Sequence, residues 1–158
     1  MWNYTTDNVL STANPAFCSY LICVNLLILK MMGLTLLTIL QRMRDKVFIS
    51  AEDAAWMNGE VKDNETVART RRTFQNDLEN IPVFFLASLA YLFTNPPLWV
   101  VNLLFIVFLV TRTLHSFVYA IYVMRQPTRA TLWAVGFAIT GYMAIHSAIH
   151  AFVIGYIP

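Results

Sequence analysis

Four polar side chains recur at helical spacing inside one of the most apolar stretches of the chain. Arg112, His115, Ser116 and Tyr119 stand at positions i, i+3, i+4 and i+7, so a helix would place them on one face. A guanidinium, an imidazole, a hydroxyl and a phenol can bind an anion and orient a polar ligand. Ionisable groups are costly in an apolar environment and usually face protein or a water-filled cavity. We therefore expect a functional site on this face.

A second polar set follows the same rule earlier in the chain: Arg69, Arg72, Asn76 and Glu79. Arg42 and Arg44 end the first apolar run, and Arg129 begins the last. All these groups lie at corresponding ends of their predicted helices, so they could converge. Guanidiniums form bidentate pairs with carboxylates, so the site would suit a small ligand with two carboxylates and an amine. Beside lipid, the same pocket could admit an apolar second substrate.

The elements that must position these groups are predicted by the apolar runs. The chain has 158 residues, of which 58% are hydrophobic and 13% charged, and its mean hydropathy is +0.56. These values exclude an ordinary soluble domain. A membrane-spanning helix needs about 20 apolar residues. We predict an all-α membrane protein, a single domain over 1–158 with four transmembrane helices at about 15–40, 65–93, 98–124 and 129–157, joined by a long polar connection over 41–64 and two short turns.

The basic residues predict the orientation of this four-helix bundle. Seven of the eleven Lys and Arg residues lie between 41 and 72, and Arg125 and Arg129 lie beside the last turn. Both regions fall on one side, which the positive-inside rule makes cytosolic. The connections between helices one and two and between three and four are then cytosolic, and the termini are lumenal. We expect membrane lipids as partners and no nucleic acid.

Several of these residues also have a purely structural interpretation. Arg112 could form an interhelical ion pair with Glu79 or Asp77, and Lys30 could snorkel or pair with an acid of the second helix. Arg44 and Lys46 could serve only as anchors at the membrane surface. His146 and His150 are four residues apart, but no carboxylate or further His accompanies them, so we expect no metal.

Three segments together resemble a known family: RRTFQNDLENI (71–81), RTLHSFVYAIYV (112–123) and QPTRA (126–130), with KVF and AED between 46 and 53. They are similar to the MAPEG family of membrane proteins in eicosanoid and glutathione metabolism, and within it to the insect-type microsomal glutathione transferases. The related microsomal prostaglandin E synthase shares much of the pattern. The resemblance implies a homotrimer of four-helix subunits in the endoplasmic reticulum or the outer mitochondrial membrane. It also implies glutathione bound between subunits near the cytosolic face.

The resemblance also assigns roles to individual residues. The implied glutathione contacts are Arg42, Arg71, Arg72, Asn76, Glu79, His115 and Tyr119. Arg112 would be a cation lining the site, and Arg129 would stand beside the thiol as the catalytic residue. The implied reaction is conjugation of glutathione to a lipophilic electrophile, with reduction of lipid hydroperoxides as a second activity. A prostaglandin E synthase-like isomerase and a non-catalytic, lipid-binding scaffold remain alternatives.

The chain departs from the family pattern at several positions. Phe74 stands where many members have His, Gln75 replaces an Arg found in some members, and Ala68 stands where an acid is common. Ala130 and Trp133 replace a Ser and a Tyr of the prostaglandin synthase, which counts against that activity. Ala54 stands where the mammalian transferase has a Cys, which counts against activation by thiol modification.

Overall fold

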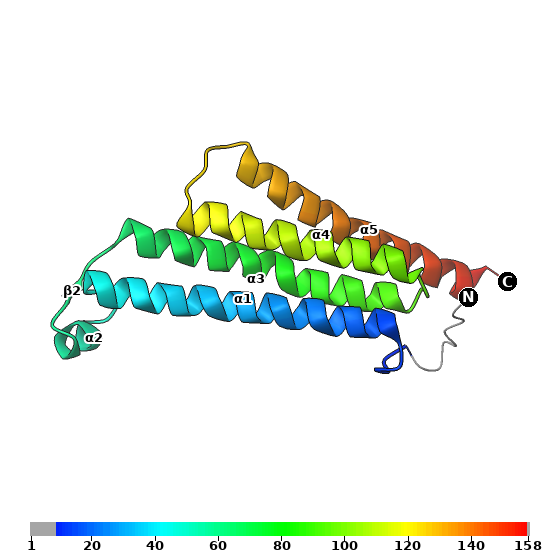
Figure 1. The fold of residues 1–158 in the computed structure, drawn as a ribbon, viewed down its shortest axis with the longest axis horizontal. Coiled ribbons are helices and arrows are strands. Elements are labelled where there is room, and N and C mark those ends of the chain that lie inside the picture. The colour runs from blue at the N-terminus through cyan, green and yellow to red at the C-terminus, as the bar shows by residue number, and fades with distance from the viewer. Residues whose placement is uncertain (1–8, 158) are drawn as a thin grey trace.

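The computed structural model describes residues 9–157, so the ends of the predicted 1–158 domain and the predicted lumenal N-terminus reach beyond the described part. Four long helices run side by side along the molecule (Figure 1): α1 (Pro15–Asp45), α3 (Glu65–Leu92), α4 (Leu98–Ser116) and α5 (Thr128–Tyr156). A π-helical turn, η2 (Phe117–Ile121), continues α4. The fold is therefore mostly helical, as the sequence predicts.

Side-chain caps explain where two of the helices begin. Asn14 accepts a hydrogen bond from the backbone N–H of Ala16 at 3.0 Å and so satisfies one of the free donors at the start of α1. Asn64 caps α3 in the same way. Its side-chain amide also donates to the Asp45 carboxylate at 3.0 Å, which ties the start of α3 to the end of α1.

The predicted boundaries agree at the second and fourth helices and differ elsewhere. The helices predicted at 65–93 and 129–157 are observed at Glu65–Leu92 and Thr128–Tyr156. The helix predicted at 15–40 continues to Asp45. The polar residues that follow the apolar run form one more helical turn. The helix predicted at 98–124 ends at Ile121, where Tyr122 becomes extended and its N–H donates to the Phe117 carbonyl. The apolar run therefore continues over residues 122–124 without forming a helix.

The connection predicted over 41–64 contains a small folded lobe. Strands β1 (Val47–Phe48) and β2 (Glu60–Val61) pair in parallel, and α2 (Ala51–Trp56) lies between them in the chain. Ala54 is buried in this lobe. At Gly59 an added Cβ would lie 2.6 Å from the Lys46 carbonyl oxygen, so the close approach of the two strands requires glycine.

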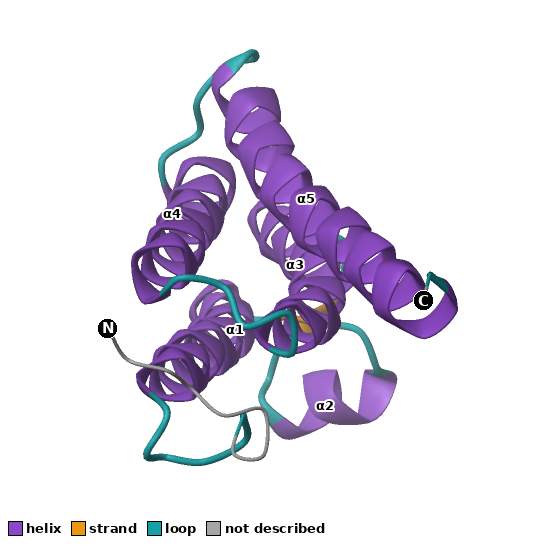
Figure 2. Cartoon of the chain, turned by 90° about the vertical axis from the view of Figure 1, so that its right-hand side faces the viewer, coloured by secondary structure: helices purple, strands orange, loops and turns teal. Residues whose placement is uncertain are grey.

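The four long helices pack in the cyclic order α1, α3, α5, α4, as the end-on view shows (Figure 2). Three of them, α1, α4 with η2, and α5, are long and apolar enough to cross a membrane. The polar first half of α3 distinguishes it from these three. On the diagonal between α3 and α4, the rings of Phe84 and Phe108 stack with centroids 3.7 Å apart, and both are buried. This stack fills the centre of the bundle.

Replacing Phe84 by Ala should lower the free energy of unfolding by about 3 kcal/mol, because a cavity would replace the stacked ring. Leu86 on the same helix is 73% exposed, and Leu86→Ala serves as the control. Because an exposed side chain leaves no cavity when it is shortened, the control should lose less than about 0.5 kcal/mol. Unfolding of each variant in mixed micelles measures both effects. Equal losses would contradict a core centred on Phe84.

Candidate functional site

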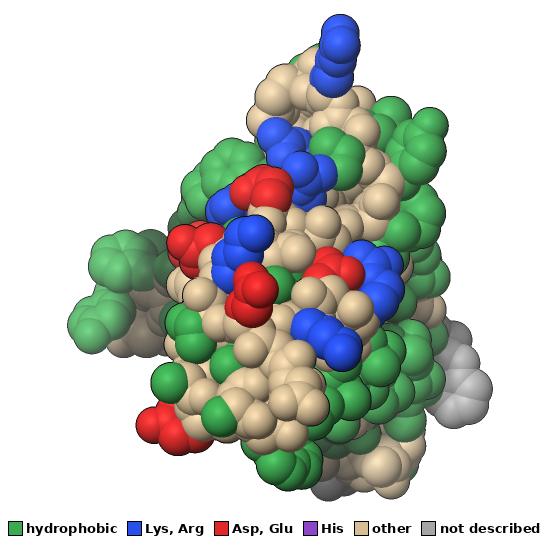
Figure 3. Space-filling model, turned by 90° about the vertical axis from the view of Figure 1, so that its left-hand side faces the viewer, with side chains coloured by type: hydrophobic (Ala, Val, Ile, Leu, Met, Phe, Trp, Pro, Cys, Tyr) green, Lys and Arg blue, Asp and Glu red, His purple; other side chains and the backbone are tan. Residues whose placement is uncertain are grey.

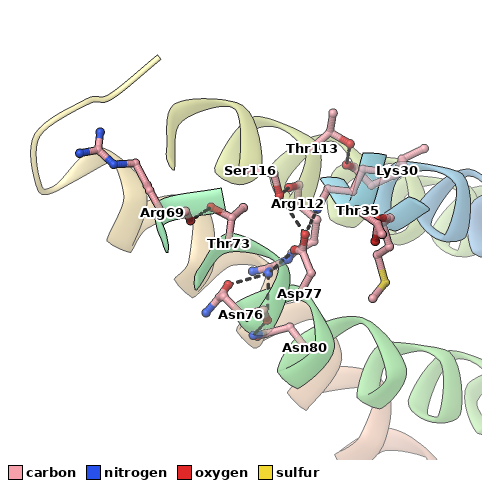
Figure 4. A network of polar contacts seen from close by, with 12 residues as sticks. Lys30, Thr35, Arg69, Thr73, Asn76, Asp77, Asn80, Arg112, Thr113 and Ser116 are labelled. Carbon is pink, nitrogen blue, oxygen red and sulfur yellow. Dashed lines mark hydrogen bonds and ion pairs between the residues drawn. The ribbon is translucent and has the colours of Figure 1, made fainter. Parts of the chain in front are cut away.

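A buried carboxylate, Asp77, joins three helices. Its side chain has no exposed surface. One oxygen, Oδ1, accepts a hydrogen bond from Arg112 Nη2 of α4 at 2.8 Å. The other, Oδ2, accepts from Lys30 Nζ of α1 and from Ser116 Oγ of α4, the latter at 3.0 Å (Figure 4). We call Lys30, Asn76, Asp77, Arg112 and Ser116 the Asp77 network.

Arg112 is completely buried yet only partly hydrogen-bonded. Its Nη2 atom also donates to the side-chain oxygen of Asn76 at 2.7 Å. Its Nε and Nη1 atoms have no hydrogen-bond partner in the described part of the chain, and neither has Nδ1 of the buried His115. Gly136 of α5 lies over this arginine, and a Cβ there would be 3.4 Å from Arg112 Cδ. Buried donors are normally satisfied, so these atoms are candidates for contact with a ligand or water.

A second group of side chains lies around Tyr119, where η2 ends α4. The Arg129 guanidinium of α5 lies 4.5 Å from the centroid of the Tyr119 ring, in cation–π geometry. Arg72 of α3 interacts with the Tyr119 hydroxyl and also forms an ion pair with Glu65 at 2.7 Å. The His115 and Tyr119 rings are 5.9 Å apart. Single π-helical turns occur frequently at functional sites, and here the turn brings Tyr119 between two cations.

A groove of about 660 Å³ opens between the C-terminal half of α1 and the N-terminal half of α3. Its charged lining is Arg42, Arg71 and Arg72, and its apolar lining includes Ile39, Phe74 and Leu78. Arg42 and Arg71 form no salt bridge with any of the described residues. Figure 3 shows Lys, Arg, Asp and Glu side chains gathered at this end of the molecule. The groove therefore combines positive charge with an apolar wall.

The structure distributes the predicted site residues over these three neighbouring places. Asn76, Arg112 and His115 lie in or beside the Asp77 network. Arg72, Tyr119 and Arg129 interact where η2 ends α4, and Arg42 and Arg71 line the groove. Glu79 is exposed on α3, where it accepts from Gln75 Nε2 at 3.4 Å. Of the two ion pairs considered for Arg112, the structure forms the one with Asp77.

Arg112 and His115 are buried within their own bundle. The reason is that Asp77 attracts Arg112 across the diagonal, and Gly136 lets α5 cover it. Asp77 and Lys30 were predicted only as structural ion-pair partners, and Ser116 was predicted on the polar face with Arg112. The sequence feature that indicates the pairing of Lys30 with Asp77 is their opposite charge on two different helices. An unpaired charge inside such a helix bundle is costly.

The chain belongs to the MAPEG family, because the family profile matches residues 20–149. Among curated relatives, microsomal glutathione S-transferase 1 of Rattus norvegicus is 36% identical over 135 residues, covering 82% of this chain and 84% of the relative. Prostaglandin E synthase of Equus caballus is 34% identical over 125 residues, covering 78% and 81%. The human prostaglandin E synthase is 32% identical over 125 residues, covering 78% and 82%. These matches confirm the resemblance to the family.

Asp77→Ala should lower the free energy of unfolding by about 3–5 kcal/mol, because it leaves Lys30 and Arg112 buried without a counter-charge. Asp63 is an exposed carboxylate between β2 and α3 with no salt bridge among the described residues. Asp63→Ala is therefore the matched control and should change stability by less than about 0.5 kcal/mol. Thermal unfolding in detergent measures both. An Asp77→Ala protein as stable as the control would contradict the network's role.

Proposed function

We propose that this protein is a membrane glutathione transferase that conjugates glutathione to lipophilic electrophiles. The observation that carries the proposal is the position of Arg129, which lies on Tyr119 beside Arg72, close to a cationic groove with an apolar wall. Glutathione carries two carboxylates, an ammonium group and a thiol. Three guanidiniums would bind its carboxylates, and Glu79 and Asn76 would bind its amine and amide groups. Several curated relatives are named microsomal glutathione S-transferase 1.

In the proposed reaction, Arg129 stabilises the glutathione thiolate. A free thiol has a pKa near 8.5, and only the thiolate is strongly nucleophilic. A guanidinium beside the sulfur favours the anion by charge and hydrogen bonding. Lowering the thiol pKa by one to two units corresponds to about 1.4–2.7 kcal/mol. The thiolate then attacks the electrophilic carbon of an aryl chloride, the carbon–sulfur bond forms, chloride leaves, and the thiol proton passes to water.

Reduction of lipid hydroperoxides would use the same thiolate. It attacks the terminal peroxide oxygen, the O–O bond breaks, and the lipid leaves as an alcohol after taking up a proton. A second glutathione then converts the sulfenic acid of the first to the disulfide and releases water. Two thiols are oxidised for each peroxide reduced. The apolar lining of the groove would hold the lipid part of either substrate beside the sulfur.

We propose that the working unit is a homotrimer with glutathione bound between subunits. In the single chain the groove is open on one side, and only 6% of the most apolar window of α5 is buried. A neighbouring copy would cover both. We also propose that α3 is the fourth span and that the α2 lobe and the turn before α5 are cytosolic. The termini would be lumenal, in the endoplasmic reticulum or the outer mitochondrial membrane.

A second candidate is a prostaglandin E synthase-like isomerase, because other curated relatives carry that name at 31–34% identity. The thiolate of bound glutathione would also be the reactive group in that isomerisation. Against this candidate, Ala130 and Trp133 at the start of α5 replace the Ser and the Tyr of the prostaglandin synthase pattern. A lipid-binding scaffold without catalysis is the third candidate. Its weakness is that Tyr119, Glu79 and Arg129 are all retained.

Arg129→Ala should lower kcat for conjugation of a chloro-nitrobenzene substrate by roughly 100-fold, the loss typical when one group stabilising a developing charge is removed. Arg125 is the matched control, since it is an exposed arginine in the same turn with no salt bridge among the described residues. Arg125→Ala should retain the wild-type kcat. Steady-state rates in detergent measure the effect, and thiolate absorbance of bound glutathione reports the cause.

The same assay distinguishes the candidate functions. Equal rates in wild type and Arg129→Ala would remove Arg129 from the mechanism. A wild-type protein that binds glutathione and isomerises a prostaglandin endoperoxide, but conjugates no aryl chloride, would favour the isomerase. Bound lipid with neither reaction would favour the scaffold.

The proposed assembly predicts a complex of three subunits with one glutathione site at each interface. Native mass spectrometry of the detergent-solubilised protein should give three times the 18.1 kDa subunit mass. Saturating glutathione should stabilise this complex against heating, because a ligand that binds only the folded trimer shifts the equilibrium toward it. Monomers that bind glutathione as tightly as the complex would contradict an interface site.

A further inference from the structure

Arg112 holds Asp77 through a single nitrogen. An arginine next to a carboxylate commonly forms two parallel hydrogen bonds, one to each oxygen. Here Nη2 reaches Oδ1 at 2.8 Å, while Oδ2 is occupied by Lys30 Nζ and Ser116 Oγ. The second edge of the guanidinium, Nε and Nη1, is left without a partner in the described part of the chain. The lysine of α1 thus occupies the oxygen that Arg112 would otherwise use (Figure 4).

The charge of the Asp77 network is also unbalanced. Lys30 and Arg112 contribute two positive charges, and Asp77 is the one carboxylate that forms an ion pair with either of them among the described residues. Lys30 is 13% exposed through its side chain, and the other two are completely buried. A buried surplus charge is costly unless an anion compensates it. The network therefore has one unit of positive charge and free N–H donors available for an anionic ligand.

We propose that Lys30 is a positioning residue for glutathione binding, acting through Asp77 on Arg112. By occupying Oδ2, it keeps Arg112 from pairing with both oxygens of the carboxylate. The free edge of the guanidinium and its surplus charge then remain available to an anionic group of glutathione that reaches the Asn76–Arg112 end of the network. Lys30 itself does not touch the ligand. The inference rests on the proposed function, since it assumes that glutathione is the anion.

A purely structural role for Lys30 has a different signature. If Lys30 only ties α1 to α3, replacing it with an apolar residue should weaken folding and leave glutathione affinity unchanged in the folded fraction. If it positions Arg112, the same replacement leaves Asp77 and Arg112 as a balanced pair. Balanced buried pairs fold well, and replacing a buried charge by a well-packed apolar side chain is often neutral or stabilising. Stability and affinity therefore separate the two roles.

The test is Lys30→Met, which keeps an unbranched side chain and removes the charge, compared with Lys30→Arg, which restores a cation. Isothermal titration of glutathione into the detergent-solubilised protein gives Kd, and conjugation rates give KM and kcat. Lys30→Met should raise Kd and KM for glutathione about tenfold, the effect of losing one charge-assisted contact. Its kcat should stay within about twofold and its unfolding temperature should not fall. Lys30→Arg should return Kd toward the wild-type value.

A second variant tests the same oxygen without changing charge. Ser116→Ala removes one of the two competitors for Oδ2, so it should raise Kd for glutathione slightly alone and add to the effect of Lys30→Met. Thr113→Val on the same helix is the matched control, since the Thr113 side chain bonds only to the Leu109 carbonyl of its own helix within residues 9–157. It should leave Kd unchanged.

Each outcome decides between the roles. Wild-type glutathione affinity in Lys30→Met overturns the inference, and so does a Lys30→Arg protein as weak as Lys30→Met. A Lys30→Met protein that fails to fold also overturns it, because the remaining ion pair should be stable. If the wild-type protein neither binds nor conjugates glutathione, the proposed function fails instead, and the titration of the wild type shows this before any variant is compared.

Discussion

The structure depends on one carboxylate that three helices share. Asp77 lies completely buried on α3 and accepts hydrogen bonds from Lys30 of α1 and from Arg112 and Ser116 of α4. None of these charges could remain alone at this depth, so the pairing constrains how the helices face one another. Gly136 then allows α5 to pack over Arg112. The arrangement of the bundle follows from satisfying this network as much as from packing apolar side chains.

The Asp77 network separates an apolar part of the bundle from a charged part. On one side of the network, toward the turn between α3 and α4, the centre is filled by aromatic side chains, with Phe84 stacked on Phe108. On the other side, toward the α2 lobe, the helix ends carry the groove with Arg42, Arg71 and Arg72, and the contact between Arg129 and Tyr119. An apolar half of the bundle thus adjoins a half that carries charged side chains. That juxtaposition suits chemistry between a polar peptide thiol and an apolar substrate.

Much of the fold could be predicted because the signals for it are local. The apolar runs located the four long helices, and two of them to within one residue. Three segments of the sequence also resemble the family, and the MAPEG match over residues 20–149 confirms that resemblance. The lobe between α1 and α3 was missed because its strands have two residues each, too few for a pattern. The end of α4 was misplaced because an apolar run continues beyond the last helical turn.

The sequence by itself determined the approximate extent of the four long helices, the polar faces of two of them, and the family. Helical periodicity relates residues on one helix, and it does not say which side chain another helix will present to them. Asp77 and Glu79 are two residues apart, about 200° around a helix, so only the packing of α3 against α4 decided which acid meets Arg112. Tertiary structure likewise assigned Lys30 to the second oxygen of Asp77, because that contact joins residues 47 positions apart. Such pairings depend on distances between helices, and those exist only once the chain has folded.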